Sequence, residues 1–192
     1  LDKVNYKIAI IGLGYVGLPL AIEFGKKFNV IGYDINNDRL DDLKNFNDYT
    51  KEINKKDFKE AKFLEFTNNF EDLKICNIFI ITVPTPVDKA NQPNLNFLKI
   101  ASINVGKILK KKDIIIYEST VYPGATEEFC VPLLCEYSSL SYNKDFFCGY
   151  SPERINPGDK VNTLTTVPKI TSGSNKKTAT FIDQLYKKII KA

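Results

Sequence analysis

Short, uninterrupted apolar runs alternate with longer amphipathic stretches along the whole sequence, and this alternation constrains the fold more than any other feature. The apolar runs predict strands at residues 6–11, 29–34, 63–67, 78–83, 114–117 and 146–150. The stretches between and after them predict helices at residues 16–27, 38–45, 97–109, 125–137 and 178–190. Strands that are apolar throughout belong in a parallel sheet covered on both faces. We therefore expect an α/β fold built on a Rossmann-type doubly wound parallel sheet.

A glycine-rich segment, residues 12–17 (GLGYVG), follows the first predicted strand and opens the first predicted helix. In this setting the spacing indicates a dinucleotide site, and a glycine-rich turn without a ligand is the alternative. Gly12 would permit the tight turn, Gly14 would let the backbone approach a pyrophosphate, and Gly17 would let helix and strand pack closely. The pyrophosphate would then accept hydrogen bonds from N–H groups at the helix N-terminus.

Two charged side chains close to the end of the second predicted strand bear on the choice of cofactor. Asp34 lies 22 positions after Gly12, where a carboxylate accepts hydrogen bonds from the adenosine ribose. Because a carboxylate repels a 2′-phosphate, NAD is favoured over NADP. Arg39 follows five positions later, and we interpret it as stacking on or near the adenine. The alternative for Arg39 is a charge on the surface of a helix.

Small hydroxyl side chains stand at the ends of two later strands, in residues 83–87 (VPTPV) and 117–124 (YESTVYPG). Ligands of open α/β sheets bind at the carboxyl ends of the strands. Thr85, Ser119 and Thr120 are therefore candidates to contact the ribose and nicotinamide of the cofactor. Each of them alone is more often a strand-end cap.

Composition narrows the remaining function classes. The 27 basic residues are all lysine except two and are scattered along the chain, which favours a solvated surface over a nucleic-acid footprint. No apolar run is long enough to cross a bilayer and no signal peptide is apparent, so we expect a cytoplasmic protein without a membrane partner. With no histidine and no paired cysteines, we expect no metal site, and the four cysteines are interpreted as buried thiols.

Four segments, in the order GLGYVGLPLA, VPTPV, ESTVYPGATEE and YSPERINPGD, resemble the N-terminal half of the UDP-glucose/GDP-mannose (nucleotide-sugar) 6-dehydrogenase family. The resemblance covers about residues 7–190. Such enzymes oxidise the sugar C6 alcohol to a carboxylate with two NAD+, through an aldehyde and a cysteine-bound thioester. The resemblance implies that residues 1–192 are the NAD-binding domain and that the C-terminal half, which binds the UDP-sugar, is absent. It also implies a homo-oligomeric full-length protein.

The resemblance assigns roles to individual residues. It places Tyr15 and Val16 against the pyrophosphate, Asp34 at the adenosine ribose, Arg39 by the adenine, and Thr85 and Thr120 at the nicotinamide half. Glu153 would act as the general base that helps water hydrolyse the thioester, with Thr120 as the second catalytic candidate. A surface salt bridge with a lysine is the alternative for Glu153. Arg154 and Ile155 would contact the sugar nucleotide.

Two departures from the family pattern refine the expected function. Pro157 stands where the UDP-glucose branch carries a second glutamate, which favours the branch that oxidises UDP-N-acetylhexosamines for bacterial surface polysaccharides. The sugar epimer stays open, and a UDP-glucose 6-dehydrogenase fragment is an alternative. The nucleophilic cysteine, lysine and asparagine of the family lie beyond the last residue, so we expect the isolated chain to be inactive. Two more interpretations stay open: another NAD-dependent dehydrogenase, of the 3-hydroxyacyl or 6-phosphogluconate type, and a stand-alone NAD-binding module.

Overall fold

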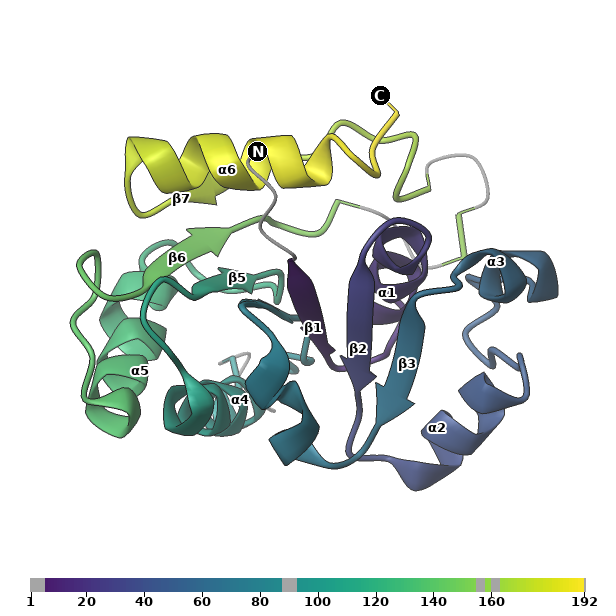
Figure 1. Ribbon diagram of the computed structural model, residues 1–192, viewed down its shortest axis with the longest axis horizontal. Helices are drawn as coiled ribbons and strands as arrows, with labels where there is room; N and C mark the ends of the chain where they lie inside the picture. The colour runs from purple at the N-terminus through teal and green to yellow at the C-terminus, as the bar shows by residue number, and fades with distance from the viewer. Residues whose placement is uncertain (1–5, 88–92, 155–157, 160–162, 192) are drawn as a thin grey trace.

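The computed structural model describes residues 6–87, 93–154, 158–159 and 163–191, and its strands form one seven-stranded sheet (Figure 1). The strands are β1 (Lys7–Ile11), β2 (Asn29–Tyr33), β3 (Leu64–Thr67), β4 (Ile78–Ile81), β5 (Ile114–Tyr117), β6 (Phe147–Tyr150) and β7 (Ser172–Gly173). They lie in the order β3-β2-β1-β4-β5-β6-β7. Every neighbouring pair is parallel except β6 and β7, which are antiparallel. The predicted doubly wound α/β fold is confirmed.

Helices cover both faces of the sheet (Figure 1). α1 (Gly17–Gly25) and α6 (Lys176–Tyr186) pack on one face, and α4 (Asn96–Ile108) and α5 (Val131–Ser138) pack on the other. Two short helices, α2 (Asn37–Lys44) and α3 (Lys55–Glu60), lie in the connection from β2 to β3. None of the described helices is long and apolar enough to cross a membrane.

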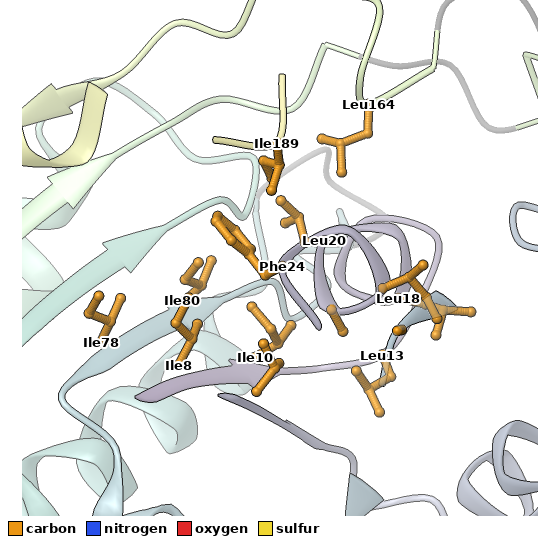
Figure 2. Packing of buried hydrophobic residues seen from close by; sticks show 14 of the residues in the cluster. Ile8, Ile10, Leu13, Leu18, Leu20, Phe24, Ile78, Ile80, Leu164 and Ile189 are labelled. Atoms are coloured by element: carbon orange, nitrogen blue, oxygen red, sulfur yellow. The ribbon is translucent and has the colours of Figure 1, made fainter. Parts of the chain in front are cut away.

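Alternate residues of the central strands face two separate apolar clusters, which explains why the strands are apolar throughout. In β1, Ile8 and Ile10 pack against α1, whereas Ala9 and Ile11 face the cluster that includes α4 and α5. β4 repeats this alternation in register with β1. Figure 2 shows the first cluster, in which the isoleucines of β1 and β4 lie beneath Phe24 of α1. The sheet is thus buried on both faces.

The strand order reverses between β1 and β4, because β1 has β2 on one side and β4 on the other. At such a switch point the connections leave the sheet in opposite directions, and a crevice opens at the carboxyl ends of the strands. The segments that follow β1, β2, β4, β5 and β6 all begin at this edge. These are the segments that carry the sequence motifs.

The structure adds short elements that the sequence did not predict. They are α3, a 3-10 helix η1 (Phe70–Ile75) and the two-residue strand β7. The helix predicted at 125–137 begins as a π turn, η2 (Thr126–Cys130), and continues as α5, whose first turn contains Pro132. The last helix ends at Tyr186, four residues earlier than predicted.

Candidate functional site

A cavity of about 640 Å³ lies at the carboxyl edge of the sheet, and most of the predicted site residues line it. Its walls come from the segments that follow β1, β2, β4 and β5, from one face of α4, and from Glu153 after β6. The predicted residues in these walls are Gly12, Gly14, Tyr15, Val16, Asp34, Arg39, Thr85, Ser119, Thr120 and Glu153. Gly17 lies behind the wall, and Arg154 does not line the cavity. Ile155 lies outside the described residues.

The three glycines of the turn differ in what a side chain would meet. Gly12 has φ +97°, in the left-handed region that favours glycine, which confirms its predicted place in the tight turn. A Cβ on Gly17 would lie 1.8 Å from the carbonyl oxygen of Gly12, so the predicted close packing of helix and strand is confirmed as well. A Cβ on Gly14 would meet no atom within 4 Å. Gly14 therefore leaves open space at the cavity wall.

Backbone N–H groups at the start of α1 are free to bind an anion. Among the described residues, no acceptor receives the N–H of Gly14, Tyr15 or Val16. These groups stand at the positive end of the helix dipole. Together with the open space at Gly14, they fit the pyrophosphate of a dinucleotide.

The peptide groups of Leu13 are held from both sides by the two charged residues singled out in the sequence. Asp34 Oδ2 accepts a hydrogen bond from Leu13 N at 2.8 Å, and Arg39 Nε donates to Leu13 O at 3.0 Å. The second carboxylate oxygen of Asp34 accepts from Asn36 N at 2.9 Å. Asp34 thus fixes the glycine turn while it remains part of the cavity wall.

Arg39 is buried, so the alternative of a charge on a helix surface is wrong. Its side chain is 2% exposed, and its Nη2 lies 2.9 Å from Oδ1 of Asp48, a residue of the loop between α2 and α3. The ring of Tyr49 covers the guanidinium at 4.2 Å. Burial alone would raise the pKa of Asp48, but the hydrogen bond from the Thr50 hydroxyl and the neighbouring positive charge of Arg39 outweigh burial and lower it. Stacking of Arg39 on an adenine stays a prediction.

Hydroxyl side chains connect the ends of neighbouring strands. Ser119 Oγ donates to Val83 O at 2.6 Å, and Thr85 Oγ1 donates to Thr120 O at 2.5 Å. These two hydrogen bonds join the segments after β4 and β5 in opposite directions. Thr82 Oγ1 donates to the carbonyl oxygen of Gly12 at 2.7 Å and so joins the end of β4 to the glycine turn.

A buried ionic network lies at the end of the cavity that holds Glu153. Lys169 Nζ lies 2.5 Å from Oε2 of Glu118 and 3.5 Å from Oε2 of Glu153. The hydroxyl of Tyr186, on α6, donates to the other oxygen of Glu118. Burial raises the pKa of Glu118 above its usual range, although the neighbouring ammonium of Lys169 opposes this effect. Two carboxylates and one ammonium leave this end of the cavity with one negative charge when all three are ionised.

The structure bears on one of the two interpretations of Glu153, the surface salt bridge with a lysine. The ion pair of Glu153 with Lys169 exists, but the two side chains are only 8% and 6% exposed, so it is not a surface salt bridge. The other oxygen of Glu153 accepts from Arg154 N at 2.6 Å. The Arg154 guanidinium is exposed and donates to Pro168 O at 2.8 Å.

The cysteines lie away from the cavity walls. Cys76, Cys130 and Cys148 are buried as predicted, whereas Cys135 is partly exposed, so the prediction of a buried thiol is wrong there. Burial raises the pKa of Cys76 and of Cys130 to about 11. Burial also raises the pKa of Cys148 well above its usual value. These three thiols are therefore protonated at neutral pH, and a thiol is a poor nucleophile compared with a thiolate. Among the described residues, no group of three metal-ligating side chains is assembled.

Sequence reasoning missed several residues of the site. Glu118 belongs to a motif that the sequence singled out, and its position at a strand end was an available signal. Asp48 and Lys169 carry no such signal, because each lies in an irregular segment at least nine residues from its partner.

Comparisons with known proteins agree with this geometry. Residues 6–190 match the model of the NAD binding domain of the UDP-glucose/GDP-mannose dehydrogenase family. The chain is 57% identical over 188 residues to a UDP-N-acetyl-D-glucosamine 6-dehydrogenase of Pseudomonas aeruginosa, which covers 98% of this chain and 44% of that protein. A protein of the same name from Salmonella typhi is 55% identical, over 100% of this chain and 45% of its own length.

A solved structure shows the same fold. The UDP-D-ManNAc dehydrogenase of Pyrococcus horikoshii superposes with a TM-score of 0.89 and 34% sequence identity, covering 97% of this chain and 45% of that chain. The chain therefore spans less than half the length of the relatives that it matches.

Proposed function

Because the chain belongs to the UDP-glucose/GDP-mannose dehydrogenase family and contains its NAD-binding domain, we propose that the whole protein oxidises the C6 hydroxyl of a UDP-N-acetylhexosamine to a carboxylate. One observation carries the proposal. A single cavity holds the open glycine turn at one wall and the carboxylate of Glu153 at another. The proposed cofactor site and the proposed general base thus line one cavity at the same edge of the sheet.

The residues around the cavity divide the work of binding. The N–H groups of Tyr15 and Val16 bind the pyrophosphate, and Asp34 accepts hydrogen bonds from the adenosine ribose. Thr85 and Thr120, already joined by a hydrogen bond, contact the nicotinamide half. Two molecules of NAD+, bound in turn, would accept the two hydrides that oxidation of an alcohol to a carboxylate releases.

Glu153 is the proposed general base for the last step, the hydrolysis of the thioester that links the oxidised sugar to the enzyme. It takes the proton from the attacking water. A general base must be ionised and aimed at the water that it deprotonates. The ammonium of Lys169 lies 3.5 Å from one carboxylate oxygen of Glu153, and the hydrogen bond from Arg154 N holds the other. The nucleophile that carries the acyl group is supplied by a part of the protein outside this chain, because the cysteines here lie away from the cavity.

The sequence after Glu153 and the relatives support an N-acetylated sugar. Pro157 replaces the second glutamate of the UDP-glucose branch, and the Pseudomonas aeruginosa and Salmonella typhi relatives are both UDP-N-acetyl-D-glucosamine 6-dehydrogenases by name. Arg154 and Ile155 are the proposed contacts of the sugar nucleotide, and the exposed guanidinium of Arg154 suits a phosphate. UDP-N-acetyl-D-glucosamine is therefore the first substrate to test, and bacterial surface polysaccharide precursors are the proposed products.

Further features of the whole protein follow from the same proposal. Residues 1–192 form one domain, and the full-length protein is a homo-oligomer with no nucleic-acid or membrane partner. The four free cysteines suit the reducing cytoplasm. Light scattering of the full-length protein tests the oligomer.

The proposal is tested in two steps. This chain is titrated with NAD+ by calorimetry, and saturable one-to-one binding is expected. A longer form with the length of the relatives is then assayed for NADH formation with UDP-N-acetyl-D-glucosamine, its manno and galacto epimers, and UDP-glucose. If the chain binds NAD+ but the longer form turns over none of these sugars, the proposed oxidation is wrong and the alternative of a stand-alone NAD-binding module is favoured. Preferred turnover of UDP-glucose would favour the other branch.

A further inference from the structure

We propose that Asp48 is a cofactor-specificity residue, because it neutralises the buried guanidinium of Arg39 and so keeps the adenosine end of the cavity unattractive to a 2′-phosphate. The inference rests on the proposed function, since it concerns which dinucleotide enters the same site. Asp48 itself does not line the cavity and acts only through Arg39.

Arg39 is placed where it would otherwise favour NADP. It lines the cavity beside Asp34, and both side chains hold the peptide groups of Leu13. A guanidinium stays charged at any physiological pH and is the group that accommodates a 2′-phosphate in this type of fold. The preference of the site for NAD or NADP therefore depends on which group compensates the positive charge of Arg39.

Asp48 supplies the compensating charge. Its Oδ1 lies 2.9 Å from Arg39 Nη2, and the two side chains are 0% and 2% exposed. Water screens a pair this deeply buried very little. Asp48 also accepts hydrogen bonds from the N–H groups of Glu52 and Ile53 and from the hydroxyl of Thr50. Its position is thus fixed by its own loop as well as by Arg39.

The guanidinium of Arg39 keeps unused hydrogen-bond donors. Among the described residues, neither Nη1 nor Nη2 meets an acceptor in hydrogen-bonding geometry, although Nη2 forms the ion pair with Asp48. Only Nε is bonded, to Leu13 O. Arg39 therefore keeps donors that Asp48 does not use, and the charge of Asp48 offsets the attraction of the guanidinium for a phosphate.

The local charges give the direction of the effect. Asp34, Arg39 and Asp48 together carry one negative charge, which disfavours a dianionic 2′-phosphate. Removal of the Asp48 charge brings the sum to zero, while Asp34 still repels the phosphate. The preference for NAD should therefore weaken without reversing.

The test compares the dissociation constants of NAD+ and NADP+ for this chain by titration calorimetry, at low salt and at physiological salt. In Asp48→Asn, the ratio of the NADP+ constant to the NAD+ constant is expected to fall by about tenfold or more. Asp48→Glu, which keeps the charge, and Asp41→Asn, which removes an exposed charge from α2, should leave the ratio unchanged. The ratio cancels any effect that both dinucleotides share.

A buried cation without its partner can prevent folding, so two further variants keep the test decisive. Arg39→Gln should raise the ratio, because the negative charge of Asp48 is then uncompensated. The double variant Arg39→Gln/Asp48→Asn should return it close to the wild-type value. An unchanged ratio in folded Asp48→Asn or in Arg39→Gln would overturn the role of Asp48 alone. A wild-type chain that binds neither dinucleotide would overturn the site and the proposal together.

Discussion

The ammonium of Lys169 lies 2.5 Å from the carboxylate of Glu118, and both side chains are almost completely removed from solvent. The pair joins the end of β5 to the segment before β7. The hydroxyl of Tyr186, on α6, donates a hydrogen bond to the other carboxylate oxygen of Glu118. A buried ion pair adds little net stability, but removal of one partner leaves an uncompensated charge. The effect of Lys169 on stability should therefore become visible when it is removed, because its loss leaves the buried carboxylate of Glu118 without a cation.

We expect Lys169→Met to lower the free energy of unfolding by about 3–5 kcal/mol, because Glu118 would remain buried beside Glu153 without a cation. Urea titration followed by circular dichroism measures the loss. The double variant Lys169→Met/Glu118→Gln should recover most of it.

Lys187→Met is the matched control for this lysine. Lys187 pairs with Asp183 at 2.8 Å, but its side chain is 72% exposed, so a change below about 1 kcal/mol is expected. A similar loss in both variants would show that burial of the Lys169 pair has no special effect.

Gly14→Val should abolish NAD+ binding and leave the fold intact. The new Cβ meets no atom within 4 Å and stands where the pyrophosphate is proposed to lie. The measurement is calorimetric titration together with thermal unfolding. Gly17→Val is the contrasting variant, because its Cβ would lie 1.8 Å from Gly12 O and should unfold the turn. Normal binding by Gly14→Val would mean that the glycine turn has a structural role only.

Asp113 should make the chain more stable at mildly acidic pH. Burial raises the pKa of Asp113 to about 6, although the N–H of Lys110 donates to it at 2.8 Å. A raised pKa means that the folded state holds the proton more tightly than the unfolded state does. The contribution is therefore fully present below about pH 4 and is lost as the pH rises through about 6.

The size of this effect is about 3 kcal/mol, since each pKa unit corresponds to about 1.4 kcal/mol. Asp113→Asn should remove this pH dependence, which is measured by urea unfolding between about pH 4 and pH 8, and the slope should be confined to about pH 4–6, where the folded and unfolded states differ in protonation. Asp113 immediately precedes β5, at the edge of the sheet opposite the cavity, so NAD+ affinity should not change. Parallel pH curves for the variant and the wild type would contradict the assignment.

This chain alone should bind NAD+ but oxidise no UDP-sugar. The relatives are more than twice as long, and the buried thiols of Cys76, Cys130 and Cys148 lie away from Glu153 and the cavity. The assay follows NADH formation with the same four UDP-sugars. Sustained turnover that disappears when Cys76, Cys130, Cys135 or Cys148 is replaced would show that the active site is already complete in this chain.

The sequence predicted the sheet and the cofactor end of the site because both depend on local patterns. Strands that are buried on both faces have continuous apolar sequences, as in β1 and β4. The geometry of Gly12 and Gly17 follows from spacing within six residues. Asp34 was placed at the carboxyl edge because its distance from the glycines fixes its strand end.

The partners of the charged side chains were not predictable in the same way. Arg39 meets Asp48, and Glu118 meets Lys169, across irregular segments whose path depends on the packed molecule. No periodicity encodes such a path. α3 was missed for a related reason, since its six residues are too few to show a helical period, although Asn54 caps it.

The hydrogen bonds from Ser119 to Val83 and from Thr85 to Thr120 have a consequence for the thermodynamics of binding. Both bonds run between groups of the protein itself and hold the two strand ends together, so association need not order this wall of the cavity. The heat-capacity change on binding NAD+ should then correspond to the apolar surface of the dinucleotide and its walls, with no added contribution from coupled folding. Association should be limited by diffusion and orientation, and a single exponential should describe it at every cofactor concentration.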